Sequence, residues 1–156
     1  MAQRHKSLIP LSRDHYEGLL LSQQIGADRV MMNGWPPDPV GRARFVARFY
    51  EEHLKIHFVA EEESLFPSVT NHVPQPSHLV NELIGEHRAM EEFVSRFAKA
   101  DSPTVTKELN EFAEILERHI RKEERQLFPL FENHAPDEIL TQTGRMIQRH
   151  YPSQKP

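Results

Sequence analysis

HFVAEEESLFP, residues 57–67, returns later in the chain as HIRKEERQLFP at residues 119–129. Six of the eleven positions are identical without a gap, and they include the histidine and the glutamate four places after it. Residues i and i+4 share one face of a helix, so each copy aims an imidazole and a carboxylate at the same neighbour. Two such helices facing each other would supply the nitrogens and oxygens that a dinuclear metal site needs.

Proline divides the rest of the chain into helical blocks. Ser12 and Ser77 are suited to cap the first and third helices, and Asp38 and Ser102 each precede a proline suited to a first helical position. The expected helices cover residues 12–33, 39–67, 77–100 and 103–127, followed by a short fifth helix at 136–150 and a loose tail at 152–156. The sequence therefore predicts an all-α protein, an up-down-up-down four-helix bundle with a short C-terminal helix.

Composition narrows the classes of function. The 156 residues are most simply one domain, with a core at about 8–131 and a C-terminal extension at 132–156. The absence of cysteine excludes disulfides, iron–sulfur ligation and thiol catalysis. A net charge of −4 without a basic run argues against a nucleic-acid partner. We find no membrane-spanning or signal-like apolar segment, and so expect a cytoplasmic protein without a membrane partner.

Two further histidines complete the candidate metal site. His15 lies in the first predicted helix and His87 in the third, and each follows an acidic residue. Each half of the chain thus offers one lone histidine and one His-x-x-x-Glu. A single His-x-x-x-Glu is usually a surface pair. The duplication and the apolar stripe around both copies favour a metal site instead, because an unpaired carboxylate in a bundle core is costly.

This pattern resembles the hemerythrin-like (HHE cation-binding) domain over about residues 8–131. That resemblance implies a four-helix bundle around a non-heme di-iron centre with an oxo or hydroxo bridge. Two histidines would ligate each iron and two glutamates would bridge both; the residues concerned are His15, His57, Glu61, His87, His119 and Glu123. Ligation by nitrogen and oxygen alone suits iron, although zinc or manganese would also bind such a site.

The sequence departs from the oxygen-carrying hemerythrins on the third helix, where those proteins have His-x-x-x-His. Here Glu91 follows His87 by four residues, and it is either a seventh ligand or a surface acid. The equivalent residue of the first helix is Leu19, so we expect the more open iron to lie near Gly18 and Leu19. His53 is either an additional ligand or a histidine beside the site or in the core. A solvated face is expected for Glu62, Glu63, Glu124 and Arg125.

The resemblance implies a class of chemistry in which several functions remain open. The first is binding of O2 or NO at the metal centre for sensing, storage or stress response. The alternative is a di-iron enzyme or an iron donor, in peroxide or NO detoxification or in iron–sulfur cluster repair; a purely structural metal is a third possibility. Repair proteins of this family usually carry a cysteine-containing N-terminal segment, which this sequence lacks. The expected partner is a small diatomic ligand, and the expected assembly is a monomer or a homodimer.

Overall fold

The computed structural model describes residues 3–27, 29 and 31–152, and most of them are helical. No strand occurs within these ranges, which confirms the prediction of an all-α protein. A short 3₁₀ segment, Lys6–Leu8, leads into the first helix. The α-helices are α1 (Ile9–Gly26), α2 (Pro39–Phe49), α3 (Lys55–Ala60), α4 (Phe66–His72), α5 (Ser77–Phe97), α6 (Val105–Lys122), α7 (Phe128–His134) and α8 (Asp137–Gln148).

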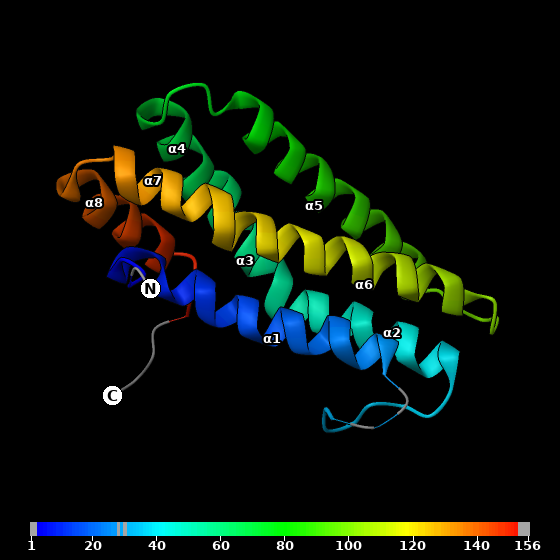
Figure 1. Cartoon of the computed structure of the whole chain (residues 1–156). Coiled ribbons are helices and arrows are strands. Elements are labelled where there is room, and N and C mark those ends of the chain that lie inside the picture. Colours follow the sequence, from blue (N-terminus) through cyan, green and yellow to red (C-terminus); the bar gives the residue numbers. More distant parts are fainter. Residues whose placement is uncertain (1–2, 28, 30, 153–156) are drawn as a thin grey trace.

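The long helices lie side by side (Figure 1). Helix α6 packs against α1 and α5, and α2 packs against α5 and α6. None of the described helices is long and apolar enough to cross a membrane. Residues 153–156 of the predicted tail lie outside the described residues.

Helical structure continues through both Leu-Phe-Pro sequences, so the helices predicted to end at residues 67 and 127 extend further, to His72 and His134. A π-helical turn precedes each proline, at Glu61–Leu65 and at Glu123–Leu127. In each turn the backbone N–H of the phenylalanine bonds the carbonyl of the glutamate five residues back. A proline clashes with the carbonyl four residues before it in a regular α-helix, and the wider turn relieves that clash.

Several predicted helix ends also shift. Ser12 lies inside α1, which starts earlier because Pro10 occupies its first turn, and α1 ends at Gly26 rather than Asn33. Ser77 is the first residue of α5 and makes no capping hydrogen bond. The predicted cap at Asp38 is confirmed, since its carboxylate accepts the N–H of residue 41 at 2.8 Å.

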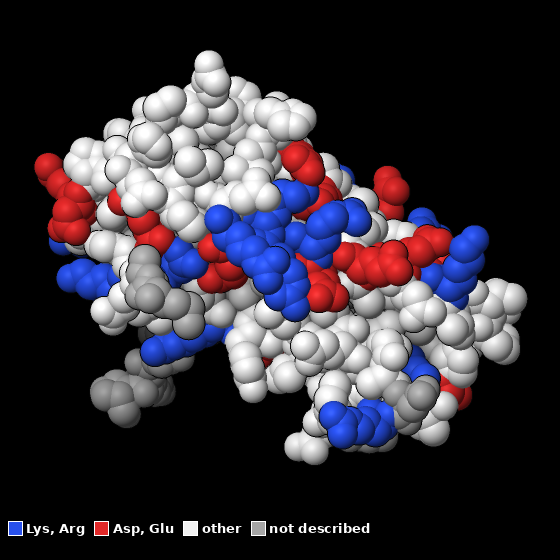
Figure 2. All heavy atoms as spheres, viewed as in Figure 1, with Lys and Arg blue, Asp and Glu red and all other residues white. Residues whose placement is uncertain are grey.

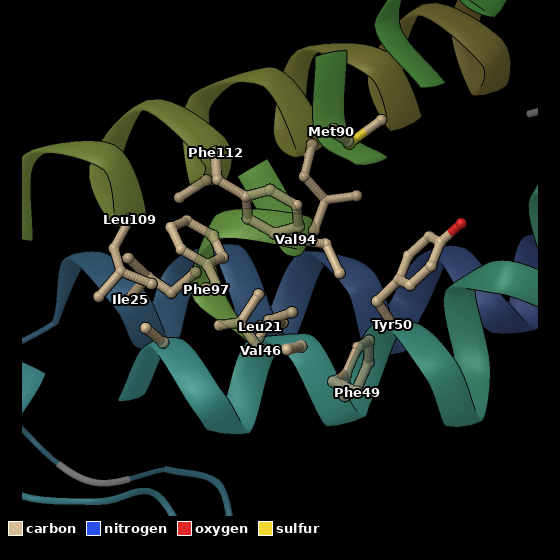
Figure 3. Close-up of a cluster of buried hydrophobic side chains, with 14 of the residues drawn as sticks. Leu21, Ile25, Val46, Phe49, Tyr50, Met90, Val94, Phe97, Leu109 and Phe112 are labelled. Carbon is tan, nitrogen blue, oxygen red and sulfur yellow. The ribbon is translucent and has the colours of Figure 1, made fainter. Parts of the chain in front are cut away.

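The apolar core of the described residues forms two clusters. The α2-side cluster contains Leu21, Phe49, Phe97 and Phe112 (Figure 3). The α8-side cluster contains Leu11, Leu65, Leu83, Phe131 and Ile147. On α1 and α5 the residues before the central histidine belong to the α8-side cluster and those after it belong to the α2-side cluster. The histidines therefore lie in a polar layer between two apolar blocks.

Helix α8 folds back onto the rest of the molecule. It packs against the 3₁₀ segment Lys6–Leu8 and the π-helical turn Glu61–Leu65. A Cβ atom added at Gly144 would come within 2.8 Å of Cβ and 3.0 Å of Cα of Ser7, so glycine permits this close approach. The segment after residue 131 thus lies next to the turn that carries Glu61.

Candidate metal centre

The structure brings the six predicted ligand residues together in the polar layer, and each is at most 3 % exposed. Ligand-type atoms that lie within 4.8 Å of one another define two groups. The first group is His15, His57, Glu61 and Glu123, and the second is Glu61, His87 and His119. Because Glu61 belongs to both, the groups are adjacent halves of one site.

Glu61 faces histidines from three helical segments. Its Oε1 lies 3.0 Å from Nε2 of His87, and its Oε2 lies 3.3 Å from Nε2 of His57. Nε2 of His87 is also 3.1 Å from Nε2 of His119. Burial alone would raise the pKa of Glu61, but the charge of His57 and hydrogen bonds hold this pKa well below its usual range. A fully buried carboxylate that stays ionised requires positive charge beside it.

Glu123 has the equivalent position in the other copy. Its Oε1 lies 3.1 Å from Nε2 of His15 and 3.1 Å from Nε2 of His119. Among the described residues, Oε2 of Glu123 and Oε2 of Glu61 are buried without a hydrogen-bond partner. Such oxygens are costly in a protein interior, and a coordinated cation would satisfy both of them.

Two of the histidines that face these carboxylates, His57 and His119, have raised pKa values in the metal-free protein. Burial alone would lower the pKa of His57, but the charge of Glu61 and the hydrogen bond with Asp14 raise it to about 10. The pKa of His119 is likewise raised well above its usual value despite burial, mainly by Glu123. The site therefore favours positive charge, which either protons or a metal ion can supply.

The outer nitrogens of two histidines meet the acidic residues that precede the lone histidines in sequence. Nδ1 of His57 lies 3.0 Å from Oδ2 of Asp14, the residue before His15. Nδ1 of His119 lies 2.9 Å from Oε1 of Glu86, the residue before His87. A carboxylate on Nδ1 fixes the tautomer and the ring orientation, so that Nε2 remains free to bind a metal.

The other two histidines are held by the glutamates next to Glu61 and Glu123. Nδ1 of His87 lies 2.7 Å from Oε2 of Glu62, and Nδ1 of His15 lies 2.6 Å from Oε2 of Glu124. The prediction that Glu62 and Glu124 belong to a solvated face is wrong, because each reaches a histidine of a neighbouring helix. Glu63, by contrast, is 66 % exposed. The signal for these contacts was the Glu-Glu pair that both copies share.

The phenylalanine of each Leu-Phe-Pro sequence packs against a lone histidine. The rings of Phe66 and His87 are stacked at 5.7 Å, and those of Phe128 and His15 at 5.4 Å. Phe58 also stacks on His87 at 3.9 Å. Apolar rings on these imidazoles reduce access of water, and each copy of the repeat thus supports the lone histidine that its own Glu-Glu pair holds.

The structure does not bring the two doubtful ligands to the site. Glu91 pairs with Arg88, which itself contacts Glu62, and its side chain is 31 % exposed. His53, within the π-helical turn Tyr50–Leu54, is 48 % exposed and lies 3.8 Å from Glu17. Without Glu91, the predicted difference between the two metals loses its basis.

Gly18 and Leu19, near which the more open iron is expected, both pack against apolar side chains. Gly18 lies against α6, where an added Cβ would come within 2.8 Å of Cδ1 of Ile120. Leu19 packs against the α2-side cluster. Gly18 thus permits close contact between α1 and α6, and Leu19 belongs to the apolar core beside the site.

Basic side chains cover the outside of the His119 half. Figure 2 shows Lys and Arg residues interleaved with acids on this face of the molecule. Nζ of Lys122 lies 2.8 Å from Oε2 of Glu86, and Nε of Arg118 lies 3.5 Å from the same oxygen. The carboxylate that holds His119 is therefore anchored by cations at its outer oxygen.

A comparison with protein-family models gives a match over residues 4–131, to the model described as hemerythrin HHE cation binding domain. All six candidate ligand residues fall within the matched range. No curated protein matches the chain. Helix α8 lies beyond the match.

Proposed function

Because the chain belongs to the hemerythrin HHE cation-binding domain family, we propose that it binds two non-heme iron ions and, through them, a diatomic ligand such as O2 or NO. Two histidines would hold each ion, one pair being His15 with His57 and the other His87 with His119. Glu61 and Glu123 would bridge both ions. We take the whole chain as one domain, with its four long helical segments in up-down-up-down order around this centre.

The observation that carries this proposal is that one buried carboxylate oxygen of Glu61 and one of Glu123 make no hydrogen bond. Glu61 contacts His57 and His87, and Glu123 contacts His15 and His119, so each glutamate faces histidines of both proposed pairs. Two divalent ions would supply the positive charge that these carboxylates demand. The all-nitrogen-and-oxygen donor set suits iron, and zinc or manganese would fit the same atoms.

When bound, a ferrous pair would supply electrons and would bind a diatomic ligand. The chain's own residues set the conditions for that chemistry. Carboxylates on the outer nitrogens hold the imidazoles in one orientation, and the rings of Phe58, Phe66 and Phe128 keep water from them. Such a site would serve in sensing, storage or a stress response.

Spectra of the iron-loaded protein would test the ligand part of the proposal. Protein loaded with Fe(II) without oxygen should develop a charge-transfer band on exposure to O2 or NO, and the band should disappear when the gas is removed. An irreversible change with consumption of the gas would indicate an enzyme instead. A spectrum indifferent to both gases would refute diatomic binding while leaving metal binding intact.

Two substitutions would test the bridging role. Glu61→Ala should weaken both metals together, because this residue belongs to both halves of the site. His15→Ala should weaken mainly one. Equal loss of a single metal in both variants would show that Glu61 does not bridge.

A further inference from the structure

Tyr151 follows α8 and lies outside the range that matches the family model. Its hydroxyl donates a hydrogen bond to Oδ2 of Asp14. The same oxygen lies 3.0 Å from Nδ1 of His57. Burial and the Asp14 carboxylate raise the pKa of Tyr151, so the phenol keeps the proton that it donates. A residue of the C-terminal extension is thus two hydrogen bonds from the candidate metal centre.

The equivalent carboxylate in the other half has a different anchor. Glu86 accepts from Lys122 through Oε2, whereas His119 contacts the opposite oxygen, Oε1. At Asp14, the phenol of Tyr151 and the imidazole share one oxygen. The carboxylate behind His119 is therefore anchored by the cation of Lys122, and the carboxylate behind His57 by the neutral hydroxyl of Tyr151. The two anchors differ although His57 and His119 are equivalent positions of the sequence repeat.

We propose that Tyr151 is a positioning residue for the His15/His57 half of the metal centre and acts on it through Asp14. This inference rests on the proposed function. The side chain of Asp14 is 27 % exposed, so without the phenol it can turn toward water. His57 then loses its fixed ring orientation, and the metal in its half is held less tightly. The His87/His119 half, anchored by Lys122, is unaffected.

A Co(II) titration against a competing chelator, followed by absorbance, would test the inference on the full chain. The two binding steps are assigned with His15→Ala and His87→Ala, each of which should lose one of them. Asp14→Ala should weaken the step that His15→Ala loses by about 10- to 100-fold. Tyr151→Phe, which removes only the hydroxyl, should weaken the same step by roughly three- to tenfold, since it acts through Asp14.

Thr143→Val is the matched control on α8. It removes a buried hydroxyl that donates to Oγ of Ser68 at 2.9 Å, without contact to Asp14. Both binding steps should stay unchanged in this variant. Tyr151→Phe should add no further loss to Asp14→Ala, because Asp14 is the residue that links the phenol to His57.

Three results would overturn the inference. Tyr151→Phe could weaken both steps equally, it could weaken metal binding further in the Asp14→Ala background, or it could leave both steps at wild-type affinity. In each case two steps in the wild-type protein would still support the proposed function. A wild-type protein that binds no Co(II) would overturn the inference and the proposed function together.

Discussion

Removing the carboxylate of Glu62 should weaken metal binding although this residue does not face the metal centre. Its Oε2 lies 2.7 Å from Nδ1 of His87, whose ring is fully buried. Without it, the buried N–H loses its acceptor, which costs about 1–3 kcal/mol. Loss of a carboxylate behind a metal-binding histidine lowers affinity about 10- to 100-fold, or about 1.4–2.8 kcal/mol. The free-energy cost of the unpaired N–H and the expected loss of metal affinity are therefore of similar size.

The neighbouring glutamate provides the control. Glu63→Ala makes the same change of charge one residue away, at a side chain that is 66 % exposed. Its effect on affinity should stay within about twofold, since exposed substitutions change free energies by about 0.5 kcal/mol or less. Competition titration with Co(II) or anaerobic Fe(II) measures both variants. Equal affinities for Glu62→Ala and Glu63→Ala would refute the role of the contact with His87.

Two further predictions concern stability. His57 has its pKa raised from 6.5 to about 10 in the metal-free protein, so the stability it contributes is full below pH 6.5 and is lost as pH rises through about 10. The melting temperature of the metal-free protein should fall as the pH rises over this range. Because metal must displace the proton of His57, the increase in melting temperature that metal causes should become larger as the pH rises. An increase that is the same at every pH would contradict this. Gly144→Ala should destabilise the fold by about 1–3 kcal/mol, because the new methyl group meets the backbone of Ser7. Gly26→Ala, with nothing within 4 Å, should be neutral or slightly stabilising, and equal urea midpoints for the two variants would rule out the close packing of α8.

The repeated sequence predicted the main features of the site because i to i+4 spacing is a local property of a helix. His57 with Glu61, and His119 with Glu123, needed only that spacing and the apolar residues around them. The π-helical turns before Pro67 and Pro129 could not be derived in this way. A proline lacks the backbone N–H for one helical hydrogen bond. The chain can accommodate this loss either by ending the helix or by changing to a wider π-helical turn, and the sequence does not distinguish the two.

The carboxylates behind the histidines were harder to predict because their partners are distant in sequence. Glu124 contacts His15 across 109 positions, so no local pattern connects them. The acids themselves were visible, since Asp14 precedes His15 and both copies of the repeat contain Glu-Glu. Which acid serves which histidine depends on how the helices pack. The same holds for Tyr151, which reaches Asp14 only because α8 folds back.

The most direct test of a two-metal centre is the iron content of the protein. Protein loaded with Fe(II) without oxygen and freed of unbound metal should contain about two irons per chain by elemental analysis. The content should fall toward one in His15→Ala and toward zero in Glu61→Ala, because Glu61 belongs to both halves of the site. A wild-type value near one, or a Glu61→Ala variant that keeps two irons, would contradict a centre in which the repeated glutamates bridge two metals.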